Sequence, residues 1–310
     1  MNKERFEFAE HIKRVTAGPG GEVLLIVGDK KTAVMECGMA FCGKKLVENV
    51  KKELPAGRSL DYIIISHSHY DHIGGLPYLK QAWPAAKVLG ASYAKEVFTK
   101  KNALKTIHEL SCTALESYQK MEPFWDVDFD FNDADLNYMD KDIHVDDVIK
   151  EGDLIDLGSA ALRVLETPGH TNCSLSFYME PDDILFPAET MGCLSPRGEM
   201  MMSMLKGYRD TMKSIEKGEK VGAKRIIAPH YGMVAKDIAE NYWNLSKSAA
   251  ETCRNLITDL SEKGASEEEI YRAYKERYWH GIRLNQQPEE AFEVNGKNVI
   301  RAILKEKESY

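Results

Sequence analysis

Three histidines and one aspartate follow directly on an apolar run, and this feature limits the fold more than any other. Residues 60–65 (LDYIII) predict a strand buried on both faces, and His67, His69, Asp71 and His72 come next along the chain. Buried polar side chains are costly unless they have partners, whereas imidazole nitrogens and carboxylate oxygens are natural ligands of divalent metals. The sequence therefore predicts a metal site here. A polar surface loop with chance histidines is the alternative, and it ranks far below.

The spacing within this cluster predicts two metal positions. His67 and His69 are alternate residues, so both can point the same way from an extended turn. Asp71 and His72 come just past the bend and would face a second position nearby.

The rest of the chain predicts an α/β (α+β) protein in which strands and helices alternate before a helical tail. Ser266 and Glu269 predict a capping box in that tail. Strands are expected at residues 11–15, 20–28, 31–38, 60–65, 87–92, 154–158, 160–170, 174–180, 184–190 and 224–228. Helices are expected at residues 43–54, 76–83, 93–119 and from about 236 onward.

Composition excludes several classes of protein. The 310 residues include 41 Lys+Arg and 49 Asp+Glu, a formal net charge of −8, so nucleic acid is an unfavoured partner. Residues 113–150 hold eleven acidic side chains against three lysines and so carry the whole of this charge. No apolar run approaches the ~20 residues that cross a bilayer, and the charged start is unlike a secretory signal. The six cysteines form no CxxC pair, which favours reduced thiols in the cytoplasm.

The His-x-His-x-Asp-His motif resembles the metal-binding signature of the metallo-β-lactamase superfamily. The similarity extends over roughly residues 12–235. It includes a Glu36-Cys37-Gly38 strand end and residues 151–158, which are similar to the strand entry before the family's fourth histidine. It also includes the Thr167-Pro168-Gly169-His170-Thr171 segment, the strand at residues 184–190 and Pro229-His230-Tyr231-Gly232.

The resemblance implies a four-layer αβ/βα sandwich over residues 1–235, with an acidic insert or lid at about 113–150 and a helical extension over 236–310. It also implies two divalent metal ions, with zinc favoured and iron or manganese as alternatives. His67, His69 and His170 would form the first metal site, and Asp71, His72 and His230 the second, with Glu189 between them.

Glu189 departs from the family, which usually has aspartate at this position. The longer side chain leaves three alternatives open. Glu189 bridges both metals, binds one of them, or leaves the site mononuclear.

The implied activity is hydrolysis of a small-molecule ester, thioester, lactone or phosphodiester by a metal-bound hydroxide. Asp71 would ligate a metal and also move a proton to the leaving group. Tyr231 would donate a hydrogen bond to the oxyanion, although packing of this ring on the core is an alternative.

Three other functions remain open at this stage. The first is a di-iron or mono-iron redox enzyme on the same fold, and the second is an RNA-cleaving or other phosphodiester-cleaving member. The third is a metal-stiffened scaffold whose tail binds a partner. Tyr271, Tyr274, Tyr278 and Trp279 would suit a homodimer interface through the C-terminal helices, or else they pack within the protein.

The acidic segment also has two interpretations. Asp126, Asp128 and Asp130 alternate with apolar residues, so the segment is an exposed strand or hairpin with an acidic face, or a lid over the metals. The side chains that would line such a lid are Phe124, Trp125, Phe129 and Phe131. An acidic lid would disfavour polyanionic substrates and favour neutral or cationic ones, such as small esters or lactones.

Overall fold

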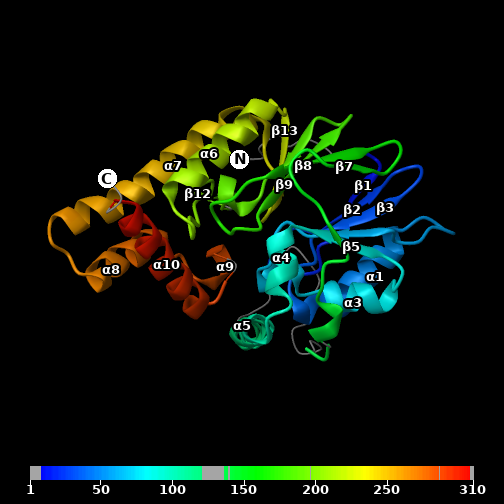
Figure 1. The fold of residues 1–310 in the computed structure, drawn as a ribbon, viewed down its shortest axis with the longest axis horizontal. Helices are drawn as coiled ribbons and strands as arrows, with labels where there is room; N and C mark the ends of the chain where they lie inside the picture. The colour runs from blue at the N-terminus through cyan, green and yellow to red at the C-terminus, as the bar shows by residue number, and fades with distance from the viewer. Residues whose placement is uncertain (1–7, 121–135, 139, 196, 286, 308–310) are drawn as a thin grey trace. The chain divides into compact units, whose positions relative to one another are not determined.

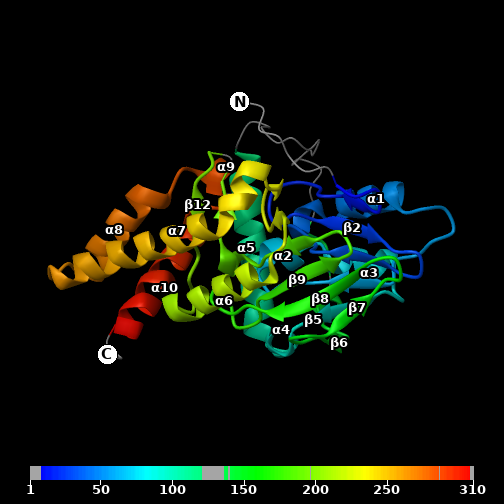
Figure 2. The same ribbon diagram turned by 90° about the horizontal axis from the view of Figure 1, so that it is seen from above.

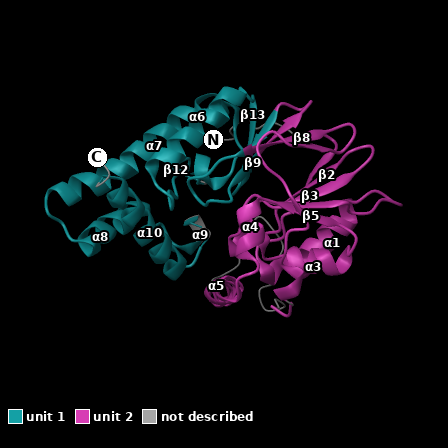
Figure 3. Ribbon diagram, in the orientation of Figure 1, with its two compact units in different colours: residues 1–6, 166–176, 184–310 teal, residues 7–165, 177–183 magenta. Residues whose placement is uncertain are grey.

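The structure is a computed structural model that describes residues 8–120, 136–138, 140–195, 197–285 and 287–307. Its contacts divide the chain into two compact units (Figure 3). Unit 1 takes in Glu166–Ser176 and Ile184–Tyr310, and unit 2 takes in Glu7–Leu165 and Phe177–Asp183. The chain therefore returns to unit 2 after entering unit 1. The division into a 1–235 domain and a 236–310 extension stays a prediction.

The first sheet lies in unit 2 and is mixed (Figure 1). Its six strands follow chain order: β1 (Ile12–Arg14), β2 (Leu24–Val27), β3 (Thr32–Met35), β4 (Tyr62–Ile64), β5 (Lys87–Gly90) and β6 (Asp147–Val148). The pairs β1–β2 and β2–β3 are antiparallel, and the remaining pairs are parallel. Ile63 and Ile64 of the central strand β4 are fully buried, as the apolar run predicted. The histidine cluster therefore follows the carboxyl end of an interior parallel strand.

The second sheet is also mixed and six-stranded, in the order β14-β13-β10-β9-β8-β7. Its strands are β7 (Leu154–Asp156), β8 (Ala161–Glu166), β9 (Leu175–Glu180), β10 (Ile184–Phe186), β13 (Arg225–Ala228) and β14 (Gly232–Met233). The pair β10–β13 is parallel, and the pair β13–β14 is antiparallel. A separate hairpin joins β11 (Cys193–Leu194) to β12 (Met200–Met201).

Helices accompany the strands in both units. Unit 2 holds α1 (Gly43–Glu53), α2 (Tyr70–Ile73), α3 (Leu76–Ala82), α4 (Ser92–Val97) and α5 (Lys101–Gln119), with short 3-10 turns η1 (Ala40–Cys42) and η2 (Asp140–Asp142). Unit 1 holds η3 (Glu189–Met191), α6 (Tyr208–Val221), α7 (Lys236–Glu262), α8 (Glu267–Tyr278), α9 (Ile282–Asn285) and α10 (Glu289–Lys307). Helices α6 and α7 lie side by side in both views (Figures 1 and 2). The predicted α/β class with a helical tail is confirmed.

One predicted helix is two helices in the structure. Residues 93–119 were expected to be continuous, but α4 ends at Val97 and α5 begins at Lys101. Lys100 has extended backbone angles (φ −91°, ψ 111°) and starts the second helix as its N-cap residue. Such a break leaves the apolar spacing on either side intact, so periodicity alone does not reveal it.

Helix α6 was missed in the sequence because its buried face carries small and polar residues. Thr211, Ser214 and Gly218 are buried there beside Ile215, so no apolar stripe is visible. A Cβ on Gly218 would lie 2.6 Å from the Met191 sulfur, which shows how closely α6 packs against η3.

The helical tail has its own core within unit 1. Tyr271 and Tyr274 are buried in it, and Tyr278 and Trp279 pack against it partly exposed. The Ser266–Glu269 capping box is confirmed. These contacts favour packing over an interface for the tail aromatics, and the homodimer stays a prediction.

Two further expectations concern the acidic insert and membrane-spanning helices. Residues 121–135 and 139 of the acidic insert, which include Phe124, Trp125 and residues 126–131, lie outside the described residues. Among the described residues, no helix combines the length and the apolar character needed to cross a membrane.

Candidate metal centre

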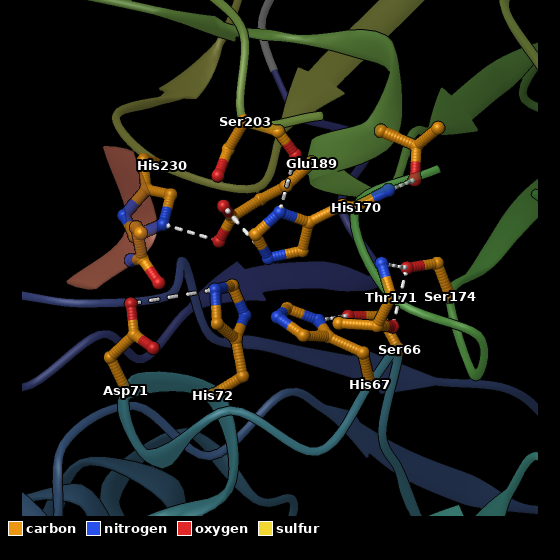
Figure 4. A network of polar contacts seen from close by, with 12 residues as sticks. Ser66, His67, Asp71, His72, His170, Thr171, Ser174, Glu189, Ser203 and His230 are labelled. Atoms are coloured by element: carbon orange, nitrogen blue, oxygen red, sulfur yellow. Dashed lines mark hydrogen bonds and ion pairs between the residues drawn. The ribbon is translucent and has the colours of Figure 1, made fainter. Parts of the chain in front are cut away.

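The unit 2 part of the site is the turn that joins β4 to α2. His67 and His72 are buried, while His69 is partly exposed and precedes α2 as its N-cap residue. The ring centroid of His67 lies 4.7 Å from that of His69 and 4.2 Å from that of His72. Asp71 Oδ2 lies 3.7 Å from His72 Nε2. The turn therefore brings together all four side chains that the motif singled out in this unit. Figure 4 shows three of them, His67, Asp71 and His72.

Glu36, at the end of β3, fixes the orientation of His72. Its Oε2 lies 2.8 Å from His72 Nδ1, and its Oε1 accepts a 2.8 Å hydrogen bond from the backbone N–H of Ser66. A carboxylate can only accept, so His72 Nδ1 carries the proton and Nε2 becomes the coordinating atom. Glu36 is buried and has a positive φ of 66°, an uncommon conformation for a residue other than glycine.

Ser66 adds a second contact of this kind, because its hydroxyl lies 2.9 Å from His67 Nδ1. This hydrogen bond occupies Nδ1 and directs Nε2 of His67 to coordination.

A glycine turn packs closely against the same cluster. Gly21 donates its backbone N–H to the Asp71 carbonyl at 2.9 Å, and a Cβ on Gly21 would lie 2.6 Å from His72 Nδ1. Gly20 has a φ of 98°, and a Cβ on Gly20 would lie 2.9 Å from the Asp71 carbonyl oxygen. This turn therefore needs glycine for close approach as well as for its backbone angles.

The unit 1 part of the site begins after β8. His170 is buried, and its Nδ1 donates to the Ser203 carbonyl at 2.9 Å, which again leaves Nε2 as the coordinating atom. Its backbone N–H donates to the Thr190 hydroxyl at 3.0 Å. Gly169 has a φ of 144°, and a Cβ there would lie 2.5 Å from a Thr190 methyl group.

Glu189 lies between two histidines of this unit. Its Oε2 is 3.3 Å from His170 Nε2, and its Oε1 is 3.0 Å from His230 Nε2 (Figure 4). The glutamate therefore reaches the coordinating nitrogen of His170 and a ring nitrogen of His230 with one carboxylate.

Tyr231 follows His230 and has a positive φ of 64°. Burial, and then the nearby Cys193, raises the pKa of the Tyr231 hydroxyl well above its ordinary value. The hydroxyl is therefore protonated at neutral pH and can donate a hydrogen bond.

The donor set of both units fits divalent metals. His67, His72 and His170 each engage Nδ1 with a partner other than a metal, as metal-binding histidines do. Carboxylates and imidazoles together suit zinc, iron and manganese.

Comparison with known proteins identifies the family to which this chain belongs. The family model described as "Metallo-beta-lactamase superfamily" matches residues 18–230. The chain belongs to the metallo-beta-lactamase superfamily. The match includes all seven candidate ligands, and α7–α10 lie beyond it.

Three relatives illustrate the similarity. The metallo-beta-lactamase fold-containing protein ST1585 of Sulfurisphaera tokodaii is 28% identical over 242 residues, which cover 76% of this chain and 81% of that protein. A hydroxyacylglutathione hydrolase of Bradyrhizobium sp. is 28% identical over 140 residues, 44% of this chain and 37% of that enzyme. The match thus spans well under half of the hydrolase. The structure of a metallo-beta-lactamase family protein from Thermus thermophilus has a TM-score of 0.63 at 14% identity and covers 97% of this chain and 94% of that one.

The predicted fold class is therefore confirmed as the metallo-beta-lactamase fold, with two mixed sheets, flanking helices and C-terminal helices. The chain also carries a His-rich cluster in each unit. Sequence reasoning missed the partners of the candidate ligands, namely Glu36, Ser203 and Thr190. The carboxylate of Glu36, in the Glu36-Cys37-Gly38 strand end, is the one signal in the sequence for a histidine partner.

Proposed function

We propose that this protein is a metal-dependent hydrolase whose two clusters combine into one binuclear centre. In this proposal His67, His69 and His170 hold one ion. The second ion is held by the four remaining candidate ligands, Asp71, His72, Glu189 and His230. The family match spans both units and all seven side chains, which supports their joint use.

The observation that carries the proposal is the common orientation of three histidines. His67, His72 and His170 each bind a local oxygen through Nδ1, so the same ring nitrogen, Nε2, is presented for coordination in every case. Histidines that served only packing would have no reason to share this arrangement. Partners of this kind set the tautomer and ring direction of metal ligands.

Two bound divalent ions would supply a hydroxide at neutral pH and polarise the bond to be cleaved. The chain's own groups then orient the substrate and move protons. Asp71, at the start of α2, accepts the proton released by the nucleophile and passes it to the leaving group. Tyr231, which is protonated at neutral pH, donates a hydrogen bond to the developing oxyanion.

We propose small thioesters and esters as the substrate class. Support comes from the Bradyrhizobium relative, whose name denotes hydrolysis of an acyl group carried by glutathione, which is a thioester. Residues 113–150 carry eleven acidic side chains against three lysines, which disfavours polyanionic substrates such as RNA.

The test combines elemental analysis with a substrate panel. We expect about two equivalents of zinc per chain and hydrolysis of small thioesters or esters, with at least a 100-fold loss in His69→Ala. Metal-loaded protein that hydrolyses no member of an ester, thioester, lactone and phosphodiester panel would overturn the proposal. Stoichiometric iron with a visible absorption band would favour the redox alternative instead.

A further inference from the structure

Helix α7, the first of the helices beyond the family match, contacts the segment that follows Glu189. We infer that α7 is a positioning element of the metal centre and acts through the hydroxyl groups of Tyr242 and Ser246. The inference rests on the proposed function, because it assumes that Glu189 binds metal.

Both hydroxyls bond to the backbone directly after Glu189. Ser246 Oγ donates to the Met191 carbonyl at 2.8 Å and shares this hydrogen with the Tyr242 carbonyl of its own helix at 3.0 Å. Tyr242 donates its hydroxyl to the Gly192 carbonyl at 2.8 Å. The two donors are four residues apart, so they lie on the same face of α7. Both side chains are fully buried. Water therefore does not compete for these hydrogen bonds.

The segment that they hold is short. The 3-10 turn η3 is three residues long, and its N-cap residue Ala188 has no side chain that could cap it. Gly192 follows with a φ of 95°, and a Cβ there would lie 2.5 Å from the Met200 sulfur. The backbone after Glu189 is thus held by α6 and the β11–β12 hairpin as well as by the hydroxyl groups of α7.

Glu189 needs this support more than an aspartate would. Its side chain has one more rotatable bond than aspartate, yet its two oxygens must lie between His170 and His230 at 3.3 and 3.0 Å. Fixing the backbone of η3 removes one source of freedom from the carboxylate. Burial, and then Cys193, raises the pKa of Tyr242, so its hydroxyl remains a donor at any pH of interest.

The link between α8 and α9, and α9 itself, also contact this hairpin. His280 Nε2 lies 3.2 Å from Glu199 Oε2, and the Asn285 amide lies 3.9 Å from the Met201 sulfur. This hairpin leads directly to Ser203, whose carbonyl holds His170. The C-terminal helices therefore contact the segment that follows Glu189 and the hairpin that leads to the hydrogen-bond partner of His170.

The test compares metal affinity in two variants with two matched controls. Tyr242→Phe and Ser246→Ala each remove one hydroxyl that bonds to η3. Tyr271→Phe removes a buried hydroxyl that has no hydrogen-bond partner within the described residues, and Ser248→Ala removes an exposed one from α7. Zinc affinity is measured by chelator competition on the full chain. We expect about a 10-fold loss for each test variant, up to 100-fold for the double variant, and no change in the controls.

A double-mutant cycle separates positioning from general stabilisation. In a Glu189→Gln background, Tyr242→Phe should no longer change zinc affinity, because the ligand that it positions is already gone. An equal loss in that background would overturn the inference, as would wild-type affinity in both test variants. If the wild-type chain bound no metal, the proposed function itself would be refuted, which is distinct from the outcomes that overturn only the inference. Ser246→Ala removes a single oxygen, so it provides the test should Tyr242→Phe fail to fold.

Discussion

Replacement of Glu36 by glutamine should weaken metal binding through His72 alone. The carboxylate accepts two buried hydrogen bonds, from His72 Nδ1 at 2.8 Å and from the Ser66 N–H at 2.8 Å. An amide of the same shape has one accepting oxygen and one donating NH₂ group, so it can satisfy only one of these donors. The Ser66 N–H cannot give up its hydrogen, whereas an imidazole can change tautomer. In Glu36→Gln the amide oxygen therefore turns to Ser66, and His72 moves its proton to Nε2.

That shift protonates the nitrogen that would coordinate the metal. A hydrogen bond to a charged group contributes about 1.5–3 kcal/mol. Loss of a histidine partner typically weakens metal binding 10- to 100-fold, which corresponds to about 1.4–2.7 kcal/mol. The two ranges agree. We therefore expect zinc affinity to fall by one to two orders of magnitude while the stability of the metal-free protein changes little.

The assay is chelator competition with zinc at pH 7, together with urea unfolding of metal-free protein. Asp61→Asn is the control, because Asp61 also accepts a backbone hydrogen bond, from Thr32 at 2.9 Å, but precedes β4 at the end away from the histidines. It should lower stability without changing zinc affinity. Wild-type affinity in Glu36→Gln, or an equal loss in Asp61→Asn, would refute the reasoning.

Three further outcomes are expected. Shortening Glu189 to aspartate withdraws the carboxylate from contacts of 3.3 and 3.0 Å, so elemental analysis should find a loss of bound metal, and unchanged stoichiometry would contradict this. Burial raises the pKa of Asp61, but the hydrogen bonds from Lys31 and the Thr32 backbone outweigh it and leave this pKa below its ordinary value. Its contribution to stability is present above the unfolded pKa of about 3.9 and is lost as pH falls through the lower folded value. The unfolding free energies of wild type and Asp61→Asn should therefore begin to converge only as the pH falls below about 4, and a difference lost already at neutral pH would contradict this. Ser266→Ala removes the N-cap of α8 and should lower the Tm by a few degrees, and an unchanged Tm would show that the cap is dispensable.

Much of the fold was predictable because its strands are short and strongly apolar. Residues 60–65 predicted a buried strand, and β4 is a central parallel strand with Ile63 and Ile64 fully buried. The break between α4 and α5 was not predictable, because the apolar spacing continues across it. Helix α6 was not predictable either. Its close packing against η3 requires small residues at positions where an amphipathic helix usually has large apolar ones.

The sequence by itself determined the residue types of the centre. Histidines and carboxylates at the ends of apolar strands indicate metal chemistry whatever surrounds them, and local spacing is enough to find them. The partners of those residues were decided only by tertiary structure. Glu36 reaches His72 from 36 positions away, and Ser203 reaches His170 from 33 positions away. No periodic pattern links such pairs, because a hydrogen bond that fixes a tautomer depends on where two chain segments meet in space.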